Sequence, residues 1–288
     1  MIDDPIHPTL RSSLVDFPFL PSGIQPVLRP RAGIKAVVFD FYDTLVITEA
    51  RGIPRGVESA AILSEDLCRN LRGHGAVIPA SATAMQASLA AGIAAAHARR
   101  KSTDPTLRQP EVEMRQIWRD ALVAPSAPDD VLAPALARWE AWTTKSRLAA
   151  GARAMLAALR NRGLVLGIGS NAQAVSESLF SLHFGGSPES IGLTLNTWSW
   201  RLGVAKPDPR FFAAVADTAA ARHLSPRQIL FVGNDPVRDI AAAARAGMAT
   251  CLYAGDKRCL RPAGTVTPDM VITCFSQLPW LLLSDPVD

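Results

Sequence analysis

An aspartate stands at the end of a short apolar run near the start of the chain. Residues 34–39 read Ile-Lys-Ala-Val-Val-Phe, and Asp40 follows directly. Such β-branched apolar runs are typical of strands buried in a parallel sheet. A carboxylate at the tip of a buried strand is costly unless it is paired, bound to a metal or catalytic. Asp40 is therefore a candidate for an ion pair, a metal ligand or a catalytic group.

Three later segments also place polar side chains at the ends of apolar runs or in turns. Their hydroxyl, amide, ammonium and carboxylate groups are the types that position and stabilise a reacting group. In open α/β sheets the chemistry lies at the carboxyl ends of the strands, so we expect one shared site with Asp40. The segments are 167–171 with Ser170 and Asn171, 203–212 with Lys206, and 231–240 with Asn234, Asp235 and Asp239.

Strand-like and helical segments alternate from residue 150 onward. Short apolar runs bounded by glycine or polar residues are followed by stretches with apolar residues at helical spacing. The order strand–helix–strand–helix predicts an α/β fold with a doubly wound parallel sheet. With the run before Asp40, the predicted strands lie at 34–39, 164–169, 191–195, 229–232 and 249–253.

Residues 48–148 differ from this pattern. They are rich in Ala and Leu, carry few strand signals and show helical spacing in four stretches, at 58–71, 82–100, 111–122 and 131–144. An all-helical insert in an alternating chain predicts a separate small domain. The core would then comprise residues 34–47 and 149–288, and the proline-rich residues 1–33 would form an N-terminal extended arm.

The composition limits the function classes. The 288 residues include 48% hydrophobic residues, enough for a real core. The net charge of +4 is scattered, which fits a small anionic substrate and gives no reason to expect nucleic acid. No apolar run reaches the roughly 18 residues of a membrane span, and the four cysteines match no zinc pattern. We therefore expect a cytoplasmic protein with reduced thiols; the oligomeric state stays open.

The four motifs, in this order, resemble the haloacid dehalogenase superfamily. The resemblance covers roughly residues 34–48 and 150–275, and the helical segment lies where that family inserts a cap, here of the C1 type. It implies a Rossmannoid core and hydrolysis through a covalent aspartyl intermediate.

The resemblance also implies a role for each motif residue. Asp40 would attack, Thr44 would orient it, and Ser170 would hydrogen-bond an oxygen of the transferred group. Lys206 would hold Asp40 and that oxygen by charge. The candidate catalytic residues are Asp40, Tyr42, Thr44, Ser170, Asn171 and Lys206.

Magnesium is the cofactor that the resemblance suggests. In metal-dependent members the nucleophile, the backbone carbonyl two residues later and an acid of the fourth motif hold Mg²⁺, which prefers hard oxygen ligands. Here these would be Asp40, the carbonyl of Tyr42, and Asp235 or Asp239. The alternative for Asp239 is that its charge stabilises the following helix.

Two positions depart from the phosphatases of this family. Tyr42 stands where they carry a second Asp that protonates the leaving oxygen, and a phenol with a pKa near 10 is a poor replacement. Tyr at this position resembles the dehalogenase branch, where a halide leaves without a proton. Asn234 replaces a common Asp, although Asp235 stands beside it. Asp43 could be proposed as a substitute acid, but the loop need not aim it at the substrate.

The reaction therefore has three candidate forms. The sequence favours phosphoryl transfer from a small organic phosphate, assisted by Mg²⁺ and passing through an aspartyl intermediate at Asp40. The first alternative is hydrolytic dehalogenation of a small haloacid, with Tyr42 as the clue. A different class is a catalytically silent protein that keeps the fold for binding alone.

Overall fold

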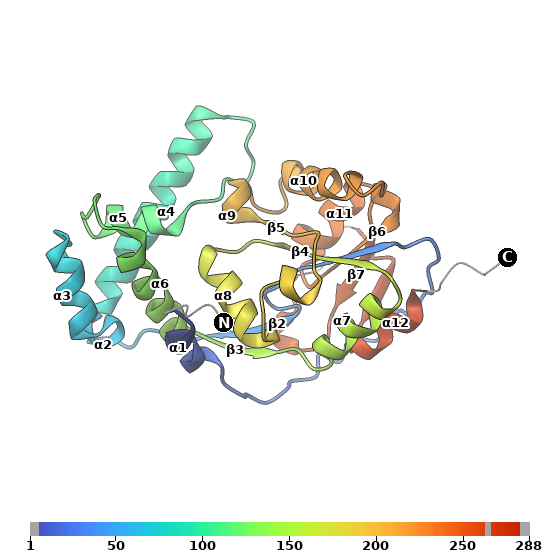
Figure 1. Cartoon of the computed structure of the whole chain (residues 1–288), viewed down its shortest axis with the longest axis horizontal. Helices are drawn as coiled ribbons and strands as arrows, with labels where there is room; N and C mark the ends of the chain where they lie inside the picture. The colour runs from blue at the N-terminus through green and yellow to red at the C-terminus, as the bar shows by residue number, and fades with distance from the viewer. Residues whose placement is uncertain (1–5, 263–265, 283–288) are drawn as a thin grey trace.

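A six-stranded, fully parallel sheet runs through the centre of the core (Figure 1). The computed structural model describes residues 6–262 and 266–282. The strand order is β5-β4-β1-β6-β7-β8. The strands are β1 (Ala36–Phe39), β4 (Val165–Ser170), β5 (Thr197–Trp198), β6 (Ile229–Gly233), β7 (Ala249–Tyr253) and β8 (Met270–Ile272).

The central strand β1 is buried on both of its faces, as its sequence predicts. Val37 and Phe39 belong to one hydrophobic cluster, whereas Val38 belongs to a second cluster on the opposite face. This alternation follows from the two-residue period of a strand. Helices therefore cover both faces, and the predicted doubly wound α/β fold is confirmed.

The two helical layers lie on opposite sides of the sheet in Figure 1. Side chains of α7, α8 and α12 pack in the cluster that holds Phe39, and side chains of α10 and α11 pack in the cluster that holds Val38. These helices and the short α9 are α7 (Ala152–Asn161), α8 (Ala174–Phe184), α9 (Ser199–Leu202), α10 (Pro209–Ala220), α11 (Ala242–Arg245) and α12 (Leu278–Leu281).

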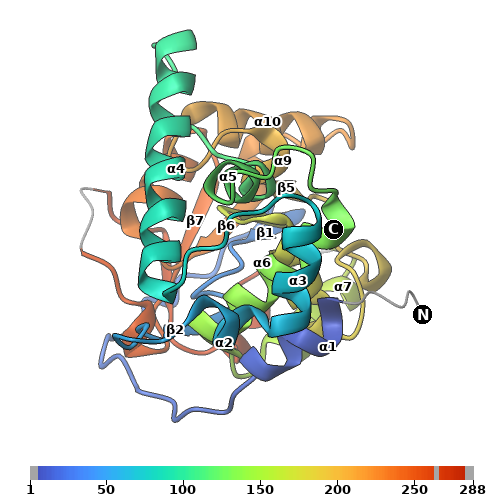
Figure 2. The same ribbon diagram turned by 90° about the vertical axis from the view of Figure 1, so that its left-hand side faces the viewer.

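The inserted segment folds as a group of helices at one end of the core (Figures 1 and 2). It has a hydrophobic cluster of its own, which includes Leu71, Met85, Trp118 and Leu132. The sequence predicts these helices well, except that Ser64, with φ of 75°, divides the predicted helix at 58–71. The helices are α2 (Ser59–Leu63), α3 (Glu65–Gly73), α4 (Ala82–Thr103), α5 (Met114–Ala121) and α6 (Asp129–Thr143). That this cap is of the C1 type stays a prediction.

A two-stranded antiparallel ribbon joins the cap to the core. It consists of β2 (Val46–Ala50) and β3 (Thr144–Leu148), which the sequence analysis did not predict. The two segments are nearly 100 residues apart in the chain, so neither carries a local signal of its partner. The chain passes from the core to the cap along β2 and returns along β3, so this ribbon fixes where the cap is attached to the core.

The predicted strand at 191–195 is wrong. Residues Glu189–Ile191 form a 3-10 turn, and Gly192 follows with φ of 88°. Leu193 makes one isolated bridge to Leu166, and the side chain of Asn196 then accepts the N–H of Ile168 at 3.0 Å. The edge strand β5 therefore starts only at Thr197.

The N-terminal segment packs along the core. It starts with the short helix α1 (Ile6–Leu10), and Val27 then bridges to Val271 on strand β8. Residues 1–5 of the predicted arm and residues 263–265 and 283–288 of the predicted core lie outside the described residues. None of the helices within residues 6–262 and 266–282 is long and apolar enough to cross a membrane.

His183 connects the core helix α8 to the ribbon strand β3, and its protonation should make the stability of the fold depend on pH. Its Nε2 lies 3.0 Å from the hydroxyl of Ser146, and burial together with the nearby Arg153 lowers the pKa of His183 from 6.5 to about 4. In the unfolded chain His183 binds a proton once the pH falls below 6.5. In the folded chain it binds that proton only near pH 4. The free energy of unfolding should therefore fall, by up to about 3 kcal/mol, as the pH drops through this interval.

Denaturant unfolding of the wild type and of His183→Gln between pH 7 and pH 4 measures this loss. The variant lacks the titrating group, so its stability should depend less steeply on pH. Parallel pH profiles of the two proteins would contradict the prediction.

Candidate functional site

Asp40 lies at the carboxyl end of β1, between the two neighbouring strands. Its N–H donates to the carbonyl of Val232 at 2.8 Å. Its Oδ1 accepts the N–H of Phe41 at 2.9 Å and lies 3.0 Å from Nζ of Lys206. Within the described part of the chain, no hydrogen bond or ion pair engages Oδ2. With the residue only 8% exposed, Asp40 thus has one oxygen held in place and one oxygen free.

Lys206 is buried between two carboxylates. Its Nζ lies 2.6 Å from Oδ1 of Asp239 and 3.0 Å from Oδ1 of Asp40. Lys206 is 2% exposed and Asp239 is 0% exposed. Burial alone would lower the pKa of Lys206, but Asp239 and Asp40 outweigh it and raise that pKa. The ammonium therefore stays charged, whereas burial raises the pKa of the neighbouring Asp239 carboxyl to about 6.

The neighbouring backbone is shaped around this cluster. Asn171 accepts the N–H of Lys206 at 2.7 Å and donates Nδ2 to the carbonyl of Lys206 at 3.0 Å. A Cβ at Gly233 would overlap the carboxylate of Asp239, so this position requires glycine. The structure thus brings Asn171 to Lys206 as a positioning residue of its main chain.

Ser170 ends β4, the strand next to β1. The residue is 0% exposed, yet its hydroxyl has no hydrogen-bond partner among the described residues. Leaving a buried hydroxyl unpaired costs about 1–3 kcal/mol. Such an unpaired group next to Asp40 is the kind of feature that a bound substrate oxygen would satisfy.

Thr44 contacts the fourth motif. Its Oγ1 lies 3.5 Å from Oδ1 of Asn234, and Nδ2 of Asn234 donates to the carbonyl of Cys259 at 2.7 Å. Both residues are buried. This amide therefore links the loop after β1 to the loop after β7.

The phenol of Tyr42 is engaged by a neighbouring helix. Its hydroxyl lies 2.9 Å from the hydroxyl of Ser176 on α8, and its ring lies against Phe41 with the centroids 4.8 Å apart. Burial, with a further contribution from Glu140, raises the pKa of Tyr42 above its ordinary value. Tyr42 therefore holds its proton tightly and is a weak acid at neutral pH.

Asp43 is held by structural contacts. It adopts a left-handed conformation with φ of 57°, and its Oδ1 accepts the N–H and the hydroxyl of Thr48 at 3.1 and 2.7 Å. Its Oδ2 pairs with Arg261. Both oxygens are thus occupied, which leaves Asp43 unsuited to act as a substitute acid.

The predicted magnesium ligands of the fourth motif are partly engaged by protein groups. Oδ1 of Asp235 caps the following helical turn, accepting the N–H groups of Val237 and Arg238, both at 2.8 Å. Asp239 uses Oδ1 for Lys206 and Oδ2 for the N–H of Asp235, at 2.9 Å. Within the described ranges, no three His, Cys, Asp or Glu side chains gather where a metal could bind. Mg²⁺ needs only one or two carboxylates besides waters. Asp239 has both oxygens engaged, whereas Oδ2 of Asp40 and Oδ2 of Asp235 accept no hydrogen bond within those ranges, so a magnesium site at these two residues stays a prediction.

The sequence analysis missed two acids that reach this region from the cap. Glu140 lies on α6, and burial raises the pKa of its carboxyl group. The carboxylate of Glu111 accepts a hydrogen bond from the hydroxyl of Ser199 at 2.6 Å and one from Nε2 of Gln173 at 3.0 Å, both residues of the core. Glu140 stands between Trp139 and Trp142 in the sequence, a pattern that indicates cap packing and gave no signal of an acid near Tyr42.

A cap segment is attached to the loop that carries Lys206. Residues 109–111 pair with residues 203–205 through the hydrogen bonds Ala205 N–H to Gln109 carbonyl, 2.9 Å, and Glu111 N–H to Gly203 carbonyl, 3.1 Å. The loop around Lys206 therefore receives support from the cap as well as from the core.

Removing the buried ammonium gives a direct test of the cluster. Lys206→Met should leave Asp40 and Asp239 buried side by side without a cation, and should lower the free energy of unfolding by about 3–5 kcal/mol at pH 7. The matched control is Lys35→Met, at an exposed position, which should change stability by less than about 0.5 kcal/mol. Equal effects of the two substitutions on denaturant unfolding would contradict the account.

Several solved structures resemble the chain. The 2-haloacid dehalogenase from Pseudomonas syringae pv. Tomato DC3000 is 22% identical, with a TM-score of 0.53 over 86% of this chain and 97% of that one. A dehalogenase in an intermediate complex is 19% identical, with a TM-score of 0.51 over 88% and 98%. A predicted phosphoglycolate phosphatase from Haemophilus somnus 129PT is 19% identical, with a TM-score of 0.46 over 85% and 96%. Identities this low show the fold alone.

The family itself is shown by the sequence. None of the curated proteins compared with the chain matches it. The family model of the haloacid dehalogenase-like hydrolases, in contrast, matches residues 34–247, which include all four motifs and the whole cap. The resemblance noted in the motifs is confirmed, and the chain belongs to the haloacid dehalogenase-like hydrolases.

Proposed function

We propose that the protein displaces a halide from a small haloacid, using Asp40 as the nucleophile and passing through an ester on its side chain. One observation carries the proposal. At the position where an acid would protonate a leaving oxygen, Tyr42 has its hydroxyl bound to Ser176 and a raised pKa. A halide leaves as a stable anion and needs no proton, whereas an alkoxide leaving from a phosphate ester does.

The first step uses the free oxygen of Asp40. Oδ2 attacks the carbon that carries the halogen, the carbon–oxygen bond forms, and the halide departs with the electron pair of the broken bond. Oδ1 is held by Lys206 and by the N–H of Phe41, which fixes the plane of the carboxylate during attack.

The same contacts suit the second step. Water adds to the ester carbonyl of Asp40, and negative charge develops on Oδ1. Lys206 at 3.0 Å and the N–H of Phe41 at 2.9 Å already point at this oxygen, so they form an oxyanion hole. Collapse breaks the bond between Cγ and Oδ2; one proton of the attacking water goes to the departing Oδ2 and the other to solvent. The hydroxy acid leaves with Oδ2, the water oxygen restores the carboxylate, and one water is consumed for each halide released.

Ser170 provides a group for the substrate. Its hydroxyl has no partner within the described residues and almost no accessible surface. A haloacid oxygen that displaces the atoms now covering it would accept its O–H without breaking an existing bond. This contact would compensate the cost of an unpaired hydroxyl. It would also favour an acid over a neutral halide of the same size.

The geometry gives less support to the reaction that the sequence favours. Phosphoryl transfer assisted by Mg²⁺ needs ligands for the metal. Asp239 has both oxygens engaged by Lys206 and by the N–H of Asp235, and one oxygen of Asp235 caps the following turn. A silent protein is also disfavoured, because the lysine, the unpaired hydroxyl and the free oxygen of Asp40 are all retained together.

The nucleophile is tested by a single substitution. Asp40→Asn should lower kcat for halide release by at least about a thousandfold, because an amide oxygen is a poor nucleophile, while the unfolding midpoint stays close to that of the wild type. Asp217→Asn on α10, an exposed position, is the matched control and should leave kcat unchanged. Halide release retained by Asp40→Asn would contradict the covalent mechanism.

The reaction class is tested by product release from a panel of haloacids and organic phosphates, each with Mg²⁺ or with EDTA. The proposal predicts halide release that is indifferent to EDTA and that persists in Tyr42→Phe within about tenfold, because the phenol donates no proton. Phosphate release that requires Mg²⁺, with no halide release, would overturn it in favour of phosphoryl transfer.

A further inference from the structure

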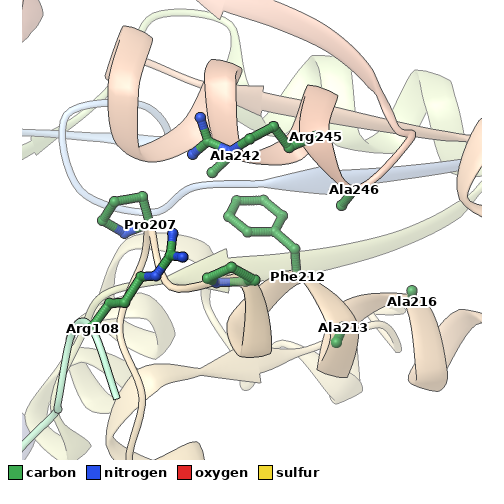
Figure 3. A pocket seen from close by; sticks show the side chains of 9 residues that line it. Arg108, Pro207, Phe212, Ala213, Ala216, Ala242, Arg245 and Ala246 are labelled. Atoms are coloured by element: carbon green, nitrogen blue, oxygen red, sulfur yellow. The ribbon is translucent and has the colours of Figure 1, made fainter. Parts of the chain in front are cut away.

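A cavity of about 430 Å³ lies between helices α10 and α11, outside the site described above. Figure 3 shows its apolar wall, formed by Phe212, Ala213 and Ala216 on one side and by Ala242 and Ala246 on the other. Asp40 and Lys206 are not among the residues that line it. Its volume falls in the range of about 300–1,000 Å³ that is typical of small-molecule sites.

The cavity exists because both helices present small side chains where they face each other. Ala213 and Ala216 are three residues apart on α10, and Ala242 and Ala246 are four apart across α11 and its end, so each pair lies on one helix face. Phe212 also lines the cavity and is only 1% exposed. The small residues keep an apolar slot open instead of filling it.

Two arginines lie at one end of this slot. Figure 3 shows the guanidinium groups of Arg108 and Arg245 at the end near Pro207. Neither forms an ion pair or a side-chain hydrogen bond within the described residues, although the nearby Arg210 is paired with Asp104 at 2.7 Å. The slot therefore combines an apolar wall with two unneutralised cations, each able to hold a carboxylate or phosphate by a fork of N–H groups.

We propose that this cavity binds a small amphipathic organic anion. Its carboxylate or phosphate head lies between Arg108 and Arg245, and its aliphatic body lies along Phe212 and the alanines of α10 and α11. The apolar body matches the apolar wall, and the head matches the two exposed arginines that lie at the same end without a protein partner among the described residues.

The site also connects the cap to the core. The N–H of Arg108 donates to Oδ2 of Asp208 at 2.8 Å, and Arg108 precedes the cap residues 109–111 that pair with the loop around Lys206. Arg245 ends α11 in the core. An anion held by both arginines therefore bridges the two parts and favours the attached position of the cap.

Octanoate is a suitable probe, with octan-1-ol as its neutral counterpart, and isothermal titration calorimetry measures the affinity. We expect one octanoate site, with Kd raised about tenfold or more by Arg108→Gln or Arg245→Gln, because each removes a charge-assisted hydrogen bond. Ala213→Leu should weaken binding by filling the slot from an exposed position. Arg222→Gln, an exposed arginine after α10, should leave Kd unchanged.

Binding should also persist in Asp40→Asn, which separates this site from the catalytic one. Three results would overturn the proposal: no saturable octanoate binding, equal affinity for octan-1-ol, or octanoate binding that survives both arginine substitutions. Loss of binding in Asp40→Asn alone would place octanoate in the catalytic site instead, and would leave the proposed dehalogenation untouched.

Discussion

The contact on which the site depends is the buried ammonium of Lys206 between Asp40 and Asp239. Burying three charges is costly, and it is tolerated only when every charge is paired at short range. The structure meets this condition with distances of 3.0 and 2.6 Å, with Asn171 holding the lysine backbone, and with a glycine that makes room for Asp239. Because Lys206 and the N–H of Phe41 hold Oδ1, Oδ2 is left for chemistry.

Much of this arrangement could be predicted from the sequence. The apolar runs before Asp40, Ser170 and Gly233 are buried strands, and a parallel register places their carboxyl ends together, with Phe39 beside Ile168 and Val232. Local hydrophobicity and the order of the motifs suffice for that inference, because both are properties of single segments. The fold, the helical insert and the family could therefore be predicted from the sequence.

The hydrogen-bond and ion-pair partners of the polar side chains could not be predicted from the sequence. Oδ1 of Asp235 caps the turn after β6, and Asp43, which could have faced the substrate, pairs with Arg261. Such choices depend on loops that meet only after folding. Two further features could not be predicted for the same reason, because they also depend on contacts between distant segments. They are the pairing of β2 with β3, and the hydrogen bond from β4 to the side chain of Asn196 where a strand was predicted. The roles of the site residues accordingly stay proposals.

Together these contacts define what the chain can do to a substrate. The proposed nucleophile, the proposed oxyanion hole and an unpaired hydroxyl come from neighbouring strands and loops, whereas a strong acid at position 42 and a cluster of three or more metal-binding side chains are not found among the described residues. The most direct test is an acid-quenched single turnover with 2-chloropropionate, followed by peptide mass spectrometry. The account predicts a transient mass increase, equal to the substrate minus chloride, on the peptide that contains Asp40. Halide release without any such adduct, or with the adduct on another residue, would contradict it.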